Sequence, residues 1–246
     1  MNGRPPRSEH LRDLGAAIER FARLLARAAG DEPVEHCPGW STRDLALHLG
    51  SIHRWAAAIV LSASMPPAEP EPLVRGELAD WYRDTGDALL AALRAVDPAE
   101  PTPNFARVHE TAAFWPRRQL HEVTVHTVDL AHALGLSPPE IPGELAADGV
   151  DELLTVFFAR LAARGSAPDV RANVRLRALD TGDDWVLGRA DAGEAPALLQ
   201  LGAPAEASIE GAASDLYLAL WGRAPHSLLR VTGEEAEALL VGPTCA

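Results

Sequence analysis

Apolar side chains recur at helical spacing through the first half of the chain, and this pattern sets the fold. Residues 8–29 place them at steps of three and four, which makes one stripe of an amphipathic helix, and Gly30 follows where a helix end is expected. Similar segments begin after Ser41, span 76–96, and run from 111–116 to Leu134. Four helices joined by short or moderate connections predict an antiparallel four-helix bundle.

The second half of the chain has a different character, which predicts two domains with the boundaries 1–138 and 139–246. Strands are expected where apolar and polar residues alternate or turn residues flank a β-rich run. The predicted elements are a helix over 144–164, strands over 170–179 and 185–187 that form a hairpin, a strand over 205–210, a helix over 212–221, a strand over 228–232 and a helix ending at 240. This half is therefore expected to be a smaller α+β domain.

Composition excludes several classes of function. All 22 positive charges are arginine, so lysine Schiff-base chemistry and a Walker A loop are excluded. The formal net charge of −13 and the lack of a basic block make nucleic acid a poor partner. With no long apolar run and no secretory-like start, we expect a cytoplasmic protein without a membrane partner. Cys37 and Cys245 are too few for a multi-cysteine zinc site.

Polar residues occupy a stripe of the fourth helix that would normally be apolar. Gln119, Glu122, His126, Asp129 and Ala133 are spaced by three and four residues, so they share one face. Buried carboxylates and imidazoles need partners, and a metal ion is one that suits them. Glu122 and His126, at positions i and i+4, can bind one ion from a single helix. The alternative is a structural hydrogen-bond network without metal.

The second helix offers the third ligand. Helical geometry places His48 about 45° from the centre of the apolar face and His53 about 95° away. His48 is therefore the preferred interior ligand, and His53 is the substitute. Two histidines and one carboxylate leave a coordination position open, as catalytic rather than structural sites do. The spacing HExxxH differs from the HExxH of zinc proteases, which argues against that class.

Other side chains have secondary expected roles. Arg118 either binds an anionic substrate or is solvated, and Asp129 orients His126 or an arginine. The proline-rich segment 65–72 is expected to be a loop or lid. A thiolate role for Cys37 is not favoured. His109, His121 and His132 are expected at the surface, while Trp40 and Trp55 are expected in the core or in a pocket wall.

Several ordered motifs along nearly the whole chain resemble the mycothiol-dependent maleylpyruvate isomerase family, within the DinB-like metalloenzyme superfamily. The matching stretches are Cys37-Pro38-Gly39-Trp40-Ser41, DLALHLGSIHRWA (44–56), RRQLHEVTVHTVDLA (117–131), LRALDTGDDWVL (176–187), and 209–233 with GAASDLYLALWGR at its centre. One departure stands at positions 127–129, where Thr-Val-Asp replaces the Arg-Trp-Asp often found in relatives.

The resemblance implies a DinB-like four-helix bundle followed by an α+β domain similar to sterol-carrier folds. Its metal triad, usually with zinc, falls on His48, Glu122 and His126. Its arginine in the LWGR-like segment corresponds to Arg223, which together with His53 is assigned to cofactor binding. Arg118, Asp129 and Arg223 are the expected catalytic residues.

The implied activity is thiol chemistry with mycothiol as cosubstrate. A zinc-activated thiolate would attack a small electrophile that carries a carboxylate, giving either isomerisation or S-conjugation. A hydrolase that uses zinc-bound water and a non-enzymatic small-molecule binder are the alternatives. The sequence leaves open the choice between monomer and homodimer.

Overall fold

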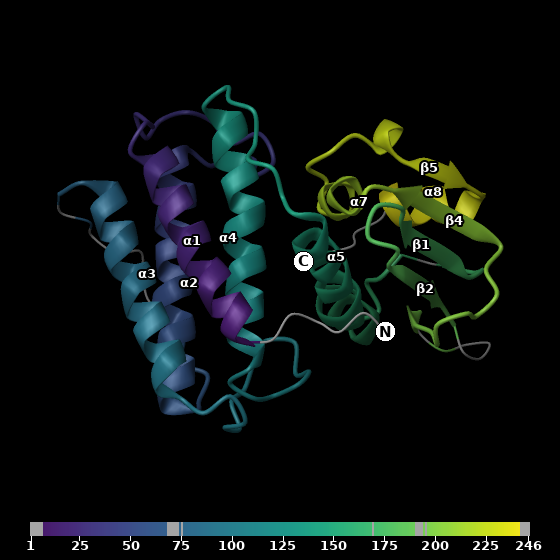
Figure 1. Cartoon of the computed structure of the whole chain (residues 1–246), viewed down its shortest axis with the longest axis horizontal. Helices are drawn as coiled ribbons and strands as arrows, with labels where there is room; N and C mark the ends of the chain where they lie inside the picture. Colours follow the sequence, from purple (N-terminus) through teal and green to yellow (C-terminus); the bar gives the residue numbers. More distant parts are fainter. Residues whose placement is uncertain are drawn as a thin grey trace. The chain divides into compact units, whose positions relative to one another are not determined.

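The computed structural model describes residues 7–67, 74, 76–168, 170–189, 194 and 196–241 (Figure 1). These residues fall into two compact units, one within 5–139 and one within 140–246. Helices make up the regular structure of the first unit, and the second combines helices with a sheet. A helical N-terminal region and a C-terminal region that contains a sheet are therefore confirmed.

Four long helices form the N-terminal unit. They are α1 (Arg7–Leu25), α2 (Thr42–Ser62), α3 (Leu78–Ala95) and α4 (Phe114–Ala133). Helices α1 and α2 each pack against both α3 and α4, and all four lie side by side (Figure 1). Their facing sides bury large apolar side chains, which removes apolar surface from water. The largest that are fully buried include Leu14, Phe21, Leu45, Leu49, Ile59, Tyr82, Leu89, Leu93, Trp115 and Leu120.

The predicted end of the first helix is wrong by four residues. Helix α1 stops at Leu25 rather than Ala29. The backbone N–H groups of Arg27 and Ala28 bond to carbonyls only three residues back, so the chain tightens into turns before Gly30. Gly30 adopts a φ of 101°, which glycine tolerates without strain. The helix thus ends in a short turn before the glycine is reached.

A capping box fixes the start of α2 directly after Ser41, where the sequence predicts that this helix begins. The Ser41 hydroxyl accepts a hydrogen bond from the backbone N–H of Asp44, and an Asp44 carboxylate oxygen accepts one from the backbone N–H of Ser41 at 2.8 Å. Both bonds satisfy N–H groups that a helix start leaves without partners. Because the first turn is fixed, helix geometry then sets the position of each later residue along α2.

A glycine cap ends α4. Gly135 has a φ of 66°, and its N–H bonds to the carbonyl of His132 at 2.9 Å. The N–H of Leu136 bonds to the carbonyl of Ala131 at 2.9 Å, which completes a Schellman motif. The sequence predicts that this helix runs to Leu134, and Leu134 is its C-cap.

The C-terminal unit is built on a five-stranded sheet in the order β3-β2-β1-β4-β5. Strands β1 and β2 form the predicted antiparallel hairpin, whereas β4 returns parallel to β1. Helix α5 packs against α7, and α7 and α8 pack against β4. The bounds are β1 (Val174–Ala178), β2 (Asp184–Gly188), β3 (Ala197–Leu198), β4 (Ala207–Gly211), β5 (Arg230–Thr232), α5 (Gly143–Glu152), α7 (Ala213–Leu220) and α8 (Glu234–Val241), with a 3₁₀ turn at His226–Leu228.

The helix predicted over 144–164 contains a π-helical segment in its middle. It consists of α5, a π-helical stretch over Leu153–Phe158, and α6 (Ala159–Ala163). Such segments are rare and usually short, and periodicity in the sequence does not distinguish them from α-helix. Strand β3 was likewise not predicted, because it is only two residues long.

Among the described residues, α2 is long and apolar enough to cross a membrane by length and composition. In the structure, 56% of the tested stretch is buried inside the protein, as is usual for a core helix. The predicted loop or lid over 65–72 lies only partly within the described residues. Its first three residues, 65–67, follow α2 without regular structure, and 68–72 lie outside the described residues, as does Cys245.

The Ser41→Ala variant is expected to lower the free energy of unfolding by about 1 kcal/mol, because it leaves the N–H of Asp44 without its cap. Denaturant unfolding followed by circular dichroism measures this. The matched control is Ser64→Ala, an exposed serine beyond the end of α2, which should change stability by less than about 0.5 kcal/mol. An equal effect of both variants would contradict the capping role.

Candidate metal centre

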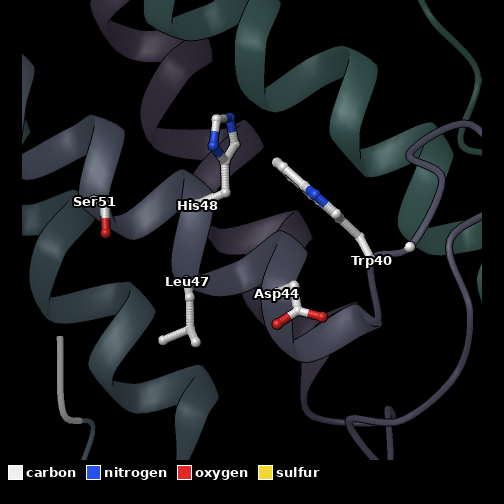
Figure 2. A pocket seen from close by; sticks show the side chains of 6 residues that line it. Trp40, Asp44, Leu47, His48 and Ser51 are labelled. Carbon is white, nitrogen blue, oxygen red and sulfur yellow. The ribbon is translucent and has the colours of Figure 1, made fainter. Parts of the chain in front are cut away.

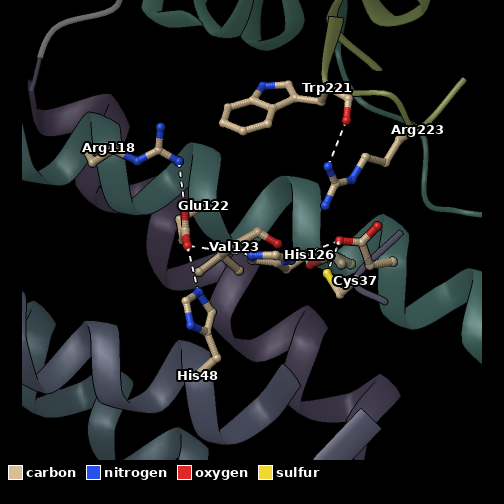
Figure 3. Close-up of polar contacts among 10 residues, drawn as sticks. Cys37, His48, Arg118, Glu122, Val123, His126, Trp221 and Arg223 are labelled. Carbon is tan, nitrogen blue, oxygen red and sulfur yellow. Dashed lines mark hydrogen bonds and ion pairs between the residues drawn. The ribbon is translucent and has the colours of Figure 1, made fainter. Parts of the chain in front are cut away.

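Two helices of the N-terminal unit bring three potential ligands together (Figure 3). His48 on α2 directs Nε2 to within 3.2 Å of Glu122 Oε1 on α4. One turn along α4, His126 Nε2 lies 3.6 Å from the same oxygen. The ligand atoms of all three residues lie within 4.8 Å of one another. The side chains are partly accessible, at 30% for His48, 19% for Glu122 and 12% for His126.

Arg118 holds the second oxygen of the Glu122 carboxylate. Its Nη2 atom donates to Glu122 Oε2 at 2.9 Å from the preceding turn of α4. The Arg118 side chain is only 3% exposed, so the alternative of a solvated arginine is wrong. Because Arg118 occupies Oε2, Oε1 is the oxygen that faces the two imidazoles.

Asp129 orients the His126 ring. Its Oδ2 atom lies 2.9 Å from His126 Nδ1, and the Asp129 side chain is fully buried. A carboxylate at Nδ1 favours the tautomer that leaves Nε2 for a metal, as in many carboxylate–histidine–metal arrangements. The Cys37 thiol also reaches this oxygen, with Sγ 3.9 Å from Oδ2.

Sequence reasoning missed Cys37 as a neighbour of this cluster, since the residue lies in a loop more than 80 positions before His126. The sulfur of Cys37 and the facing atoms of His126 and Asp129 also lie within 4.8 Å of one another. The available signals were that Cys37 closely precedes the N-cap Ser41 and that it begins the motif Cys37-Pro38-Gly39-Trp40-Ser41.

The cluster shifts the ionisation of its own members. Burial acts to raise the pKa of Glu122, but hydrogen bonds with His126 and His48 and the charge of Arg118 hold it well below its usual value. Burial likewise acts to lower the pKa of His126, and contacts with Asp129, Cys37 and Glu122 outweigh it and raise that pKa well above 6.5. Glu122 is therefore an anion that is ready to bind a cation.

The relative depths of the two α2 histidines are the reverse of those predicted. His53 is fully buried, whereas His48 is partly exposed. Burial lowers the pKa of His53 to about 3, so its ring is neutral and lies against Tyr82 at a centroid distance of 5.2 Å. The prediction from helical geometry was wrong because α2 packs against both α3 and α4. More of the circumference of α2 is therefore buried than a single apolar stripe suggests.

The three histidines predicted at the surface differ in their exposure. His109 is exposed as expected, and His132 is half-buried with its ring 5.7 Å from that of His36. His121 is fully buried, so its predicted surface position is wrong. Fifteen of the 20 residues of α4 are buried, and this leaves few positions on the helix open to solvent.

Arg223 belongs to the other unit, in the turn after α7. Its backbone N–H donates to the carbonyl of Leu218, and its Nη1 atom donates to the carbonyl of Trp221 at 2.7 Å. Gly222, with a φ of 72°, provides the turn that these contacts close.

A cavity of about 440 Å³ opens beside His48 (Figure 2). Its lining comes from the first turns of α2 and from the loop before it. The residues are Gly39, Trp40, Asp44, Leu47, His48 and Ser51. Trp40 is thus a wall of this cavity, with its ring 4.9 Å from that of His48 between centroids. His48 belongs both to the cavity and to the ligand cluster.

The arrangement fits a zinc-like cation. Ligand atoms bound tetrahedrally at 2.0–2.1 Å lie about 3.4 Å apart. The His48–Glu122 and His126–Glu122 separations of 3.2 and 3.6 Å bracket that value. Two imidazole nitrogens and one carboxylate oxygen also form the donor set of catalytic zinc sites, which keep one position open.

These features define a protein with an N-terminal helical unit, a histidine–carboxylate cluster beside a cavity, and a C-terminal unit that contains a sheet. Residues 11–131 match the family model "Mycothiol maleylpyruvate isomerase N-terminal domain", and residues 144–240 match the C-terminal domain model of the same family. The chain therefore belongs to the mycothiol-dependent maleylpyruvate isomerase family, an enzyme family, which confirms the resemblance noted from its motifs.

Solved structures agree on the fold. The crystal structure of a mycothiol-dependent maleylpyruvate isomerase, and that of its histidine-to-alanine mutant, each superpose with a TM-score of 0.65. Each match covers 92% of this chain and 93% of the other, at 14% sequence identity. No curated protein matches the sequence.

In the metal-free protein, Asp129→Asn is expected to lower the pKa of His126, because the protonated ring loses a charged acceptor. A raised pKa stabilises the folded state below about 6.5, and this contribution disappears as pH rises through the folded-state value. Titration of the ring protons by NMR measures the shift. Asp87→Asn, an exposed change on α3, is the control, and an unchanged His126 pKa in Asp129→Asn would contradict this role.

Proposed function

We propose that the chain is a metal-dependent and mycothiol-dependent enzyme that acts on a small electrophilic substrate bearing a carboxylate. The outcome is either cis–trans isomerisation or S-conjugation. The observation that carries the proposal is the convergence of His48 and His126, from two helices, on one oxygen of Glu122. Membership of a family named for mycothiol supports the identity of the thiol.

The proposed metal ligands are His48, Glu122 and His126, and the proposed metal is zinc or another divalent cation. When bound, such a cation supplies a Lewis acid that stabilises a thiolate near neutral pH. Asp129 fixes the His126 ring through Nδ1, and Arg118 fixes the carboxylate of Glu122. The side chains on α4 thus hold their donor atoms in place before any ligand arrives.

The two arginines have different proposed roles. Arg118 is committed to Glu122 at 2.9 Å, which favours positioning of the ligand rather than capture of substrate. Arg223 is proposed to bind a carboxylate or a cosubstrate group, following the family pattern in the LWGR-like segment. His53 is neutral and fully buried against Tyr82, which weighs against a direct role in cofactor binding.

The detailed fold of each domain, the cellular location, the partners and the oligomeric state are also proposals. We assign residues 1–138 to a DinB-like four-helix bundle and 139–246 to a sterol-carrier-like α+β domain, which the packing of α1–α4 and the five-stranded sheet support. The protein is proposed to work in the cytoplasm, without nucleic acid or membrane, as a monomer or homodimer. The acidic net charge of −13 supports the exclusion of nucleic acid.

Purified protein is expected to contain about one divalent cation per chain, and His126→Ala is expected to lose it, because two protein ligands hold a catalytic cation poorly. Elemental analysis by mass spectrometry measures the content. His109→Ala, an exposed histidine outside the cluster, should keep the metal. Full metal content in His126→Ala would reject the ligand assignment.

Turnover of small α,β-unsaturated acids is expected to require mycothiol. Reaction progress and the mass of thiol adducts, measured with and without mycothiol, test this. Metal-dependent turnover without any thiol would instead indicate a hydrolase. A protein that neither binds metal nor turns over any substrate would indicate a non-enzymatic binder, in which the α4 stripe is a structural network.

A further inference from the structure

The cavity beside His48 carries chemistry that the metal cluster does not use. Asp44, Leu47, His48 and Ser51 occupy one face of α2, at spacings of three, one and three residues, and Trp40 closes one side (Figure 2). A volume of about 440 Å³ is within the usual range for small-molecule sites. Since His48 is shared, a ligand whose reactive atom reaches the cluster extends into this cavity.

The charge in the cavity selects what kind of group enters it. Asp44 Oδ2 accepts hydrogen bonds from the backbone N–H and hydroxyl of Ser41, and these bonds lower the pKa of Asp44, so the side chain is an anion. Its other oxygen makes no hydrogen bond with the described residues. A carboxylate accepts hydrogen bonds only, so it favours hydroxyl and amide donors and repels an anionic substrate.

Trp40 and Ser51 extend this selection. The half-buried Trp40 ring offers an apolar face to the cavity, and ring C–H groups of a sugar pack well on such a face. The Ser51 hydroxyl can donate and accept hydrogen bonds. An aromatic face beside a carboxylate and a hydroxyl suits a neutral polyol ring.

We propose that the cavity formed by Trp40, Asp44 and Ser51 binds the neutral, hydroxyl-rich sugar portion of the thiol cosubstrate. The inference rests on the proposed thiol-dependent function and gives that thiol a site on α2. The electrophile carries a negative charge, and Asp44 keeps it out of this cavity. The enzyme thereby distinguishes a glycosidic thiol such as mycothiol from a plain cysteine derivative.

The competing interpretation is that Trp40 only supports His48, since their ring centroids are 4.9 Å apart. That role would affect every thiol equally, because it would act on the metal ligand. Binding of the sugar portion would instead affect the glycosidic thiol alone. The comparison of two thiols therefore separates the two roles.

The test compares mycothiol with N-acetylcysteine, which lacks the sugar, in wild type, Trp40→Ala and Trp40→Phe. Trp40→Ala is expected to raise the KM for mycothiol about tenfold, and to leave both kcat and the KM for N-acetylcysteine unchanged. Trp40→Phe should recover most of the loss, because it keeps an aromatic face. Equal changes for both thiols would overturn the proposal in favour of support for His48.

A second measurement does not depend on activity. The N-acetylglucosaminyl-inositol portion of mycothiol, which is neutral and has no thiol, is titrated into metal-free protein and followed by calorimetry. Wild type and Asp87→Asn are expected to bind it equally well, and Asp44→Asn is expected to bind it at least fivefold more weakly. Asp87→Asn is the matched control, because it makes the same substitution at an exposed carboxylate on α3 that does not line the cavity.

Failure of the proposed function and failure of the proposed sugar site give different results. If the protein binds no metal and uses no thiol but binds the fragment through Trp40 and Asp44, the proposed function fails and the sugar site stands. If thiol-dependent turnover is found but the fragment does not bind and both thiols respond alike, the sugar site is overturned and the proposed function stands.

Discussion

The buried carboxylate of Glu122 is the constraint on which the rest of the site depends. A carboxylate taken out of water must be compensated by charge and hydrogen bonds, or it destabilises the fold. Here Oε2 pairs with Arg118 from the same helix, and Oε1 faces imidazoles from two different helices. The second set of contacts links α2 to α4, so the register between these helices and the shape of the cluster are set together.

Sequence reasoning found this cluster because helix geometry alone places its members. The spacing of Glu122, His126 and Asp129 puts them on one face of any regular helix, and the structure brings all three into contact. The capping residue Ser41 gave the start of α2, and with it the level of His48. Local rules were sufficient here, since each depends on residues within one or two turns.

Local rules could not predict which residues the neighbouring helices and loops would bury. His53 and His121 were expected on the outer flanks of their helices, yet both are fully buried, because α2 and α4 are covered over wide arcs. The sequence alone did not show whether Arg118 points into solvent or pairs with a carboxylate. The burial of Arg118 in the structure decides this in favour of Glu122. Cys37 and Trp40 reach the site from a loop, whose path no periodicity describes. The π-helical stretch after α5 escaped for a related reason, since its apolar pattern is compatible with an ordinary helix.

Asp44 shows how closely the fold and the site are joined in this unit. One of its oxygens completes the capping box with Ser41, and the same side chain lines the cavity beside His48. The cap holds the carboxylate in a single orientation, so a ligand in the cavity meets a fixed acceptor and loses less free energy to ordering. The cap also sets where α2 begins, and nearly two turns into the helix His48 faces Glu122. A single local interaction near the start of α2 therefore positions both the acceptor in the cavity and the imidazole of the cluster, which explains how a short loop and helix start can serve two parts of one site.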